Sequence, residues 1–481
     1  MWWKFLLIFL AIAVVAFIAI VLTRTIMFKP LPQPKKDENE VEFDEDKAVE
    51  SLQKLVRCKT ISYYDPSKED PSEFEKFEKT LQEIFPLTYQ HCQRIATKGR
   101  AILLKWQGKS SNKPSVLMAH YDVVPVSQDG WSKPAFDAII EDGFMWGRGT
   151  LDTKITLNSA FNAVENLIGK GFVPENDIYL AFGGDEEVNG NGAPSIVEYF
   201  KEQGIKPALV VDEGGAVVED VFPGVHEPCA LIGIAEKGML NVKLEIRGAG
   251  GHASAPPPKT SIGKLSRACV KMEEKPFDFR ITKPALDMFD TLGRYSSFVF
   301  RMVFANLWLF KGVLNAMCKK SGGEINALLR TTVAFTQASG SVGINVLPPN
   351  ASMCANLRLI DGDTMESAKE RIVNTIDDPS INVEVLGGMN PSVISDTNNE
   401  EYEKLKSAIA STWRDAIVSP YLMVQCSDSR HYGEITDRVY RFSAMALTKE
   451  ERATIHGNDE RIPLDTIKKA TEFYIRLVSK L

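Results

Sequence analysis

The chain has 481 residues, of which 44% are hydrophobic and 25% are charged, and its formal net charge is −7. This length suggests two domains with separate cores, and the acidic balance argues against a nucleic-acid partner, which calls for a basic face. The seven cysteines are odd in number and include no C-x-x-C pair, so the sequence predicts neither a disulfide framework nor a zinc ribbon.

The N-terminal segment is the first informative element. Residues 5–23 form an uncharged apolar run, about long enough to cross a hydrocarbon core. A cleaved signal peptide would have a shorter apolar region and a small-x-small site after it, whereas this run ends Val21-Leu-Thr-Arg24. We therefore predict an uncleaved single-pass membrane anchor, followed by a solvated linker over 24–44. The charges that flank the run, Lys4, Arg24 and Lys29, nearly balance and barely orient it.

Beyond the linker, short apolar runs alternate with helical patterns, which is typical of an α/β sheet. We predict buried strands over 115–120, 176–184 and 208–212, and helices over 154–170 and 193–203. His120, Asp212 and the acidic run 185–187 fall at strand ends. Because ligands of open α/β sheets bind beyond the carboxyl ends of the strands, these residues predict a site.

The residue types at these ends are those of a metal centre. Asp122 follows His120 by two residues and could accept the second ring N–H of the imidazole. The other candidates are Asp152 at a turn before a helix, the adjacent Glu186 and Glu187, Asp212, and His456 near the C-terminus. Imidazole and carboxylate ligands suit Zn²⁺, with Co²⁺ or Mn²⁺ as substitutes. Five such groups can hold two ions if one carboxylate bridges them.

Each signal also has an ordinary structural explanation. A Glu-Glu pair is usually a solvated loop, Asp152 could be a helix N-cap, and Asp212-Glu-Gly-Gly could be a plain turn. Only the combination of these residues at strand ends indicates a metal site.

The sequence resembles the di-zinc exopeptidases that include aminoacylase, acetylornithine deacetylase, carnosine dipeptidase and carboxypeptidase S. The matching segments are His120-Tyr-Asp-Val-Val-Pro, Gly147-Arg-Gly-Thr-Leu-Asp-Thr-Lys, Gly184-Asp-Glu-Glu, Val211-Asp-Glu-Gly-Gly, Gly250-Gly-His-Ala-Ser-Ala-Pro, Gly343-Ile-Asn-Val-Leu-Pro-Pro, Ser427-Asp-Ser-Arg-His-Tyr and His456-Gly-Asn-Asp-Glu. The branch that it resembles most is that of carboxypeptidase S and the N-fatty-acyl-amino-acid hydrolases.

The resemblance implies a role for each candidate. Asp152 would bridge two ions, and its peptide bond to Thr153 would be cis. His120 and Asp212 would hold one ion, and Glu187 and His456 the other. Glu186 would be the general base, and Asp122 would orient His120.

The resemblance also implies an α/β catalytic domain, with a central sheet flanked by helices, that carries an inserted ferredoxin-like α+β lid. The expected boundaries are 45–234 and 389–481 for the catalytic domain and 235–388 for the lid. In the lid, His252 would stabilise the oxyanion, from the same chain or across a dimer. Asn345, Arg358 and Arg430 would bind substrate, because an Arg fork can hold a free carboxylate.

The predicted function is zinc-dependent hydrolysis of an amide or peptide bond next to a free C-terminal carboxylate, by a metal-bridged water with Glu186 as base. A dipeptidase for small unmodified peptides is the alternative. A non-enzymatic membrane-tethered binding protein on a hydrolase scaffold is disfavoured, because no ligand or base is missing. A serine hydrolase would call for Gly-x-Ser-x-Gly, which the sequence lacks. The resemblance suggests a catalytic domain on the lumenal or extracytoplasmic side and leaves a homodimer through the lid open.

Residues 298–310 form a second apolar stretch, in which only Arg301 and Asn306 are polar. It is too short to span a bilayer. Two interpretations remain open: a helix packed on the lid or at a dimer contact, or a segment that lines an acyl channel or dips into a membrane surface.

Overall fold

The computed structural model describes residues 2–481. Its main sheet has eight strands in the order β1-β2-β6-β3-β7-β16-β8-β15. The strands are β1 (Cys92–Ile95), β2 (Ala101–Trp106), β3 (Ser110–His120), β6 (Asn176–Gly183), β7 (Leu209–Val218), β8 (Cys229–Glu236), β15 (Ile417–Met423) and β16 (Val439–Ala446). Strand β3 is parallel to both β6 and β7. The carboxyl ends of these three predicted strands therefore meet at one edge of the sheet.

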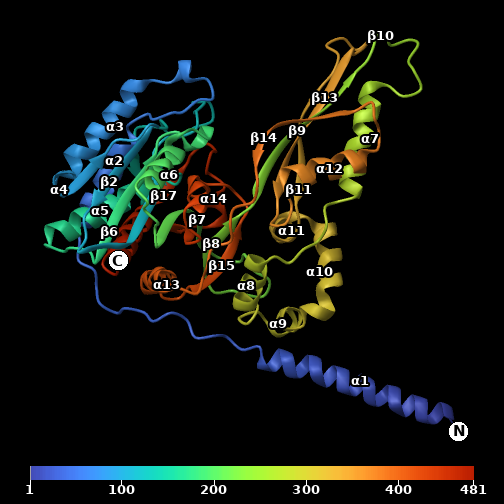
Figure 1. Cartoon of the computed structure of the whole chain (residues 1–481), viewed down its shortest axis with the longest axis horizontal. Coiled ribbons are helices and arrows are strands. Elements are labelled where there is room, and N and C mark those ends of the chain that lie inside the picture. Colours follow the sequence, from blue (N-terminus) through green and yellow to red (C-terminus); the bar gives the residue numbers. More distant parts are fainter. Residues whose placement is uncertain (1) are drawn as a thin grey trace.

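Helices cover both faces of this sheet (Figure 1), which explains why β3 and β6 are nearly continuous buried apolar runs. One face carries α2 (Glu45–Val56), α3 (Pro71–Ile84), α4 (Pro86–His91), α5 (Lys154–Gly169), α13 (Glu400–Thr412) and α15 (Leu464–Val478). The other face carries α6 (Gly192–Glu202) and the 3-10 helix Asp428–Glu434. Helix α2 begins at Asp44, whose side chain accepts a hydrogen bond from the amide of Lys47, as a favoured N-cap residue does.

Smaller elements complete this lobe. A three-stranded sheet has the order β17-β5-β4 and consists of β4 (Ile139–Glu141), β5 (Phe144–Trp146) and β17 (Arg461–Pro463). The remaining short helices are Pro66–Lys68, Glu186–Val188 and α14 (Lys449–Arg452).

A second, antiparallel sheet projects from the main lobe (Figure 1). Its order is β11-β13-β9-β14, from β9 (Gly238–Arg247), β11 (Thr332–Ser339), β13 (Asn350–Leu359) and β14 (Asn382–Met389). Helices α7 (Ser261–Glu274) and α12 (Met365–Ile376) pack on it around a core of its own. At its far tip, β10 (Gly251–His252) pairs with β12 (Val346–Leu347). The role of residues 235–388 as a lid stays a prediction.

Four helices join the two sheets: α8 (Lys283–Leu292), α9 (Phe298–Ala305), α10 (Leu307–Ser321) and α11 (Gly323–Leu329). Helix α8 packs on β15 of the main sheet. Helices α9 and α10 are bent by 111° relative to each other. The apolar stretch 298–310 therefore forms a helical corner rather than one straight helix.

The N-terminal helix α1 (Trp2–Met27) contains the predicted apolar run and is long and apolar enough to cross a membrane. A helix that meets this description near an N-terminus is either a membrane span or a signal sequence. The following linker is attached to the body: the Gln33 side chain donates to Tyr295 and accepts from the amide of Val418, both at 3.0 Å. The composition predicts a solvated linker, and the structure holds it against the body at Gln33.

Candidate metal centre

Imidazoles and carboxylates from five separate segments meet at the carboxyl edge of the main sheet. They form two trios, His120–Asp152–Glu213 and Asp152–Glu187–His456, and within each trio the ligand atoms all lie within 4.8 Å of one another. Asp152 belongs to both. Its Oδ1 lies 2.9 Å from His120 Nε2, and its Oδ2 lies 2.9 Å from His456 Nε2. One carboxylate therefore faces two separate groups of ligand atoms.

The structure brings Glu213, and not the predicted Asp212, to this cluster. Glu213 Oε1 lies 3.4 Å from His120 Nε2. Asp212 instead accepts a hydrogen bond of 3.0 Å from the amide of Ser429. Consecutive side chains of a strand point to opposite faces, so only one member of the Asp-Glu pair reaches the cluster. Asp212 as a ligand therefore stays a prediction, while the geometry places Glu213 beside His120.

Asp122 organises the cluster without entering it. Its carboxylate accepts hydrogen bonds from Ser62 Oγ at 2.6 Å and from the amides of Glu186 and Glu187, each at 3.1 Å. His120 Nδ1 lies 3.0 Å from the carbonyl oxygen of Asp122 and 3.4 Å from its carboxylate. These contacts direct Nε2 of His120 toward Asp152 and hold the turn that presents the two glutamates.

Glu460 supports the loop that presents Asp152, a role that the sequence analysis missed. Its fully buried carboxylate accepts from the amides of Gly149 and Leu151, at 3.0 and 2.8 Å, and from Arg148 at 2.6 Å. The peptide bond between Asp152 and Thr153 is cis, as the resemblance implied. Glu460 belongs to the segment His456-Gly-Asn-Asp-Glu, but its partners lie about 310 positions away, so only the fold identifies them.

Replacing Glu460 by glutamine is expected to lower the free energy of unfolding by about 3–5 kcal/mol, because Arg148 would keep a buried charge without its partner. Chemical denaturation followed by circular dichroism measures the change. The matched control is Glu434→Gln, which removes an exposed ion pair with Lys201 and should cost no more than about 1 kcal/mol. Equal losses in the two variants would contradict the role given to Glu460.

The electrostatics of the cluster fit bound cations. Burial raises the pKa of Glu186 well above its usual range and raises the pKa of Glu213 to about 8. Hydrogen bonds to Asp152 and Glu187 raise the pKa of His456 to about 10. Each trio thus gathers two carboxylates around one imidazole. Divalent ions would take the place of protons on these groups, and the oxygen and nitrogen donors suit Zn²⁺.

The predicted substrate-binding residues fall into two groups. Arg430 is largely buried, and its Nη2 donates to the carbonyl of Asn390 at 3.0 Å, while its Nη1 has no hydrogen-bond partner within the described chain. Arg358 lies 3.2 Å from the sulfur of Cys426, a residue that lines the cavity beside the metal cluster. His252 and Asn345 lie together at the exposed tip of the second sheet and do not line this cavity. Arg358 thus lies next to a residue of the cavity wall, whereas His252 and Asn345 lie apart from the cavity.

The cavity beside the cluster has a volume of about 480 Å³. Its polar end includes Asp152, Glu186, Glu187, Glu213 and His456. Its apolar wall includes Val218, Val221, Leu231, Met288, Ile325, Leu328, Met423 and Met445. None of residues 298–310 lines it: Phe304 is buried against Phe222 and Phe289, and Trp308 faces α1. The expectation that this stretch lines an acyl channel is therefore wrong for this cavity.

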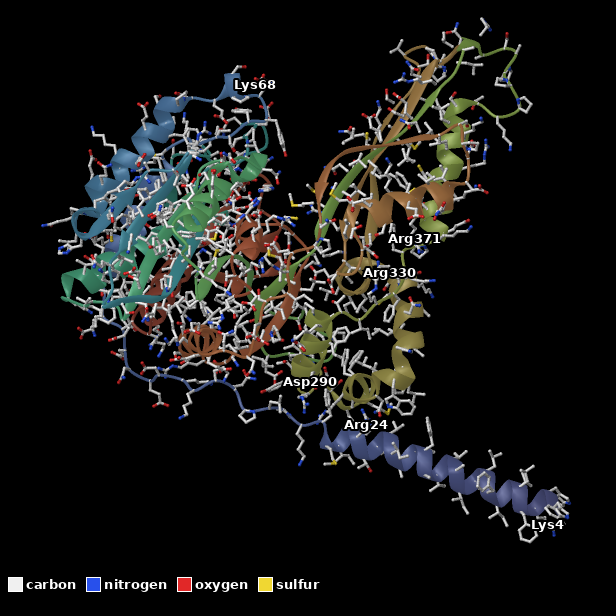
Figure 2. All side chains as sticks on the ribbon, viewed as in Figure 1. Lys4, Arg24, Lys68, Asp290, Arg330 and Arg371 are labelled. Atoms are coloured by element: carbon white, nitrogen blue, oxygen red, sulfur yellow. The ribbon has the colours of Figure 1, made fainter. Side chains whose placement is uncertain are left out.

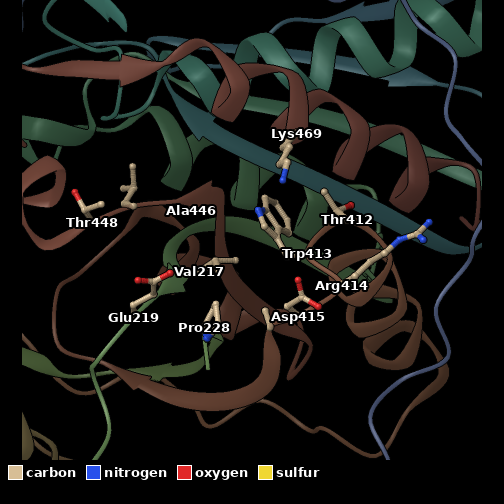
Figure 3. A pocket seen from close by; sticks show the side chains of 12 residues that line it. Val217, Glu219, Pro228, Thr412, Trp413, Arg414, Asp415, Ala446, Thr448 and Lys469 are labelled. Carbon is tan, nitrogen blue, oxygen red and sulfur yellow. The ribbon is translucent and has the colours of Figure 1, made fainter. Parts of the chain in front are cut away.

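A different cavity, of about 440 Å³, lies beside Trp413, between Thr412, Val217 and Lys469 (Figure 3). It contains none of the predicted site residues and shares only Leu447 with the cavity at the metal cluster. Neither trio of candidate metal ligands lies in its lining.

Comparison with known proteins identifies the family. The model of peptidase family M20/M25/M40 matches residues 116–480. A probable carboxypeptidase S-like protein of Dictyostelium discoideum is 34% identical over 438 residues, which cover 89% of this chain and 84% of that protein. An N-fatty-acyl-amino acid synthase/hydrolase of Xenopus tropicalis is 34% identical over 479 residues, which cover 97% of this chain and 93% of that protein.

Solved structures confirm the predicted fold of a central sheet flanked by helices. An M20 metallo-carboxypeptidase from Sulfolobus solfataricus superposes with a TM-score of 0.67 at 16% identity, covering 90% of this chain and 98% of that chain. A dinuclear metal-binding peptidase of the M20 family from Bacillus subtilis superposes with a TM-score of 0.55 at 11% identity, covering 90% of this chain and 97% of that chain. The chain belongs to peptidase family M20/M25/M40 and is an enzyme that hydrolyses amide bonds.

Proposed function

We propose that this enzyme uses two Zn²⁺ ions to hydrolyse the amide bond between an acyl or peptidyl group and an amino acid with a free C-terminal carboxylate. The observation that carries the proposal is that Asp152 is shared by two trios of ligand atoms. The names of the relatives, a carboxypeptidase S-like protein and an N-fatty-acyl-amino acid synthase/hydrolase, support the substrate class.

In this proposal His120 and Glu213 would hold one ion, Glu187 and His456 would hold the other, and Asp152 would serve both. The ions would supply a Lewis acid that polarises the scissile carbonyl and lowers the pKa of the attacking water. Glu186 takes the proton of that water and later donates it to the leaving nitrogen. Its place in the wall of the cavity, next to Glu187, supports this role.

The arginines would select the carboxylate end of the substrate. Arg430 Nη1 is buried 3.7 Å from the carboxylate of Glu236 and makes no hydrogen bond, so it keeps a donor that a substrate carboxylate could accept from. Arg358, on β13 of the second sheet, would contact the substrate from that side. His252 and Asn345 would complete the oxyanion site from a second copy of the chain, because in one chain they lie at the tip of the second sheet.

The apolar wall of the cavity predicts a preference for long acyl groups. For one amino acid that bears acetyl, octanoyl or palmitoyl, kcat/KM is expected to rise with chain length and then level off, because each buried CH₂ contributes about 0.8 kcal/mol, roughly fourfold. A coupled assay of the released amino acid measures it with the Zn²⁺-loaded full chain. Ile325→Trp, which fills the apolar wall, should flatten the series.

Val373→Trp, on the exposed surface of α12, is the matched control and should leave the slope unchanged. A flat series in the wild type, together with rapid cleavage of unmodified dipeptides, would contradict the acyl preference and favour the dipeptidase alternative. Release of no amino acid from either class would contradict the proposed function itself.

We also propose that α1 stays on the mature protein as a membrane anchor. The Arg24 side chain donates to the carbonyl of Ala305 at 3.2 Å, at the point where α1 meets the body (Figure 2). The amide of the buried Asn306 side chain donates to Thr25 Oγ1 at 3.2 Å. Cleavage before the linker would remove both contacts and leave Asn306 without its partners on α1.

The mature chain is therefore expected to begin at or near its first residue and to stay in the pellet after a carbonate wash. Intact mass analysis and membrane extraction measure the two properties. A soluble mature form that begins between Arg24 and Lys36 would show instead that the segment is cleaved.

A further inference from the structure

Helix α10 presents apolar side chains on two opposite faces. Leu307, Leu314 and Cys318 pack against the core that links α8 to the main sheet. On the outward face Leu309, Val313 and Met317 follow one another at every fourth position and are 37%, 56% and 58% exposed. A helix at a water surface is polar on its outward face, so this stripe indicates a non-aqueous surrounding. Helix α9 extends the apolar surface with Phe298 and Val299.

This apolar surface is continuous with α1. The ring of Trp308 on α10 packs edge to face against Phe17 on α1, with centroids 5.9 Å apart. Between α9 and α10, Asn306 donates to the carbonyl of Val21 at 3.3 Å as well as to Thr25. The helical corner is therefore held at a defined level along α1.

That level lies inside a bilayer if α1 spans it. Phe17 precedes Thr23, the end of the apolar run, by six residues, which is about 9 Å along a helix axis. A hydrocarbon core is about 30 Å thick, so each leaflet contributes about 15 Å. Because the ring of Trp308 lies 5.9 Å from that of Phe17, it also lies inside the hydrocarbon of that leaflet.

We propose that α9 and α10 are inserted in the membrane leaflet that lies next to the catalytic domain, where they pack against α1. The partner of the outward apolar surface is the hydrocarbon of lipid chains. Lys319 and Lys320, in the last turn of α10, would extend their ammonium groups to the headgroups. Helix α11 follows α10 directly and lines the cavity at the metal cluster, so this placement also brings that cavity next to the lipid surface. The proposal rests on the retention of α1 and is independent of the proposed substrate.

Tryptophan fluorescence in lipid vesicles tests the placement. The full chain is reconstituted in dioleoyl-phosphatidylcholine vesicles with or without dibrominated acyl chains, and the emission of Trp308→Phe is subtracted from that of the wild type. We expect brominated chains to quench more than half of this Trp308 component, and aqueous iodide to leave it unchanged. The control is the Trp131 component, obtained in the same way from Trp131→Phe. Because Trp131 belongs to the catalytic domain, brominated lipid should not quench its emission.

A second variant repeats the measurement at another position. In the Trp308→Phe background, Val313→Trp should also be quenched by brominated lipid, whereas Val373→Trp on the exposed surface of α12 should be quenched by iodide. Quenching of Trp308 and Val313→Trp by iodide would overturn the proposal in favour of a water-exposed corner. Protection from both quenchers would overturn it in favour of a contact with a second copy of the chain. Loss of α1 from the reconstituted protein would also overturn it.

Discussion

Replacing Glu186 by glutamine is expected to lower kcat by about 10²- to 10⁴-fold, the usual contribution of a general base, while the metal content stays at the wild-type level. Glutamine has nearly the same shape but cannot accept the proton of the attacking water. Glu186 lines the cavity and belongs to neither trio of ligand atoms, so its replacement removes no proposed metal ligand. Steady-state kinetics beside elemental analysis of the same preparation measures both quantities.

The neighbouring residue supplies the matched control. Glu187 Oε1 lies 3.2 Å from His456 Nε2 and belongs to one trio, so Glu187→Gln should lower metal content as well as kcat. Near-normal turnover of Glu186→Gln, or a loss of metal from it equal to that of Glu187→Gln, would show that the two roles are assigned incorrectly.

Replacing Glu213 by glutamine is expected to weaken metal binding by more than the roughly 10- to 100-fold that the loss of an outer partner costs, because it removes a direct ligand next to His120 and Asp152. Asp212→Asn should weaken metal binding by no more than that range, because Asp212 accepts from the backbone of Ser429 instead. Competition with a fluorescent zinc chelator measures the dissociation constants, and circular dichroism checks that both variants fold.

The two substitutions distinguish Glu213 from Asp212 as the ligand beside His120. A larger loss of metal from Asp212→Asn than from Glu213→Gln would restore the original choice of ligand. Equal, small losses would mean that neither carboxylate is a ligand, and the trio at His120 would then be no metal site.

Much of the metal centre could be predicted because its residues carry local signals. His120 ends β3 and the glutamate pair follows β6, as predicted, whereas β7 (Leu209–Val218) continues through the Asp-Glu pair instead of ending at it. The Gly-rich turn before Asp152 leads into the predicted helix, now α5. Strand ends are readable from sequence because burial on both faces produces uninterrupted apolar runs.

Long-range partners could not be predicted in the same way. The carboxylate of Glu460 bonds to amides of the loop 147–152, and the sequence contains no local sign of that pairing. The apolar stretch 298–310 is unusual by composition, but its residues alone do not show which side chains contact the core, which contact α1 and which contact neither.

The sequence by itself indicated the class of this protein, a metal-dependent hydrolase with an α/β catalytic domain, and predicted His120, Asp152, Glu187 and His456 in one site, because short motifs carry these residues locally. Only the tertiary structure placed Glu213, and not Asp212, beside His120, since the direction of a side chain depends on the register of β7 within the sheet. It also separated His252 and Asn345 from the metal cluster of the same chain, and it set the depth of α10 against α1. Each of these outcomes depends on contacts between segments far apart in the chain, which no local pattern specifies.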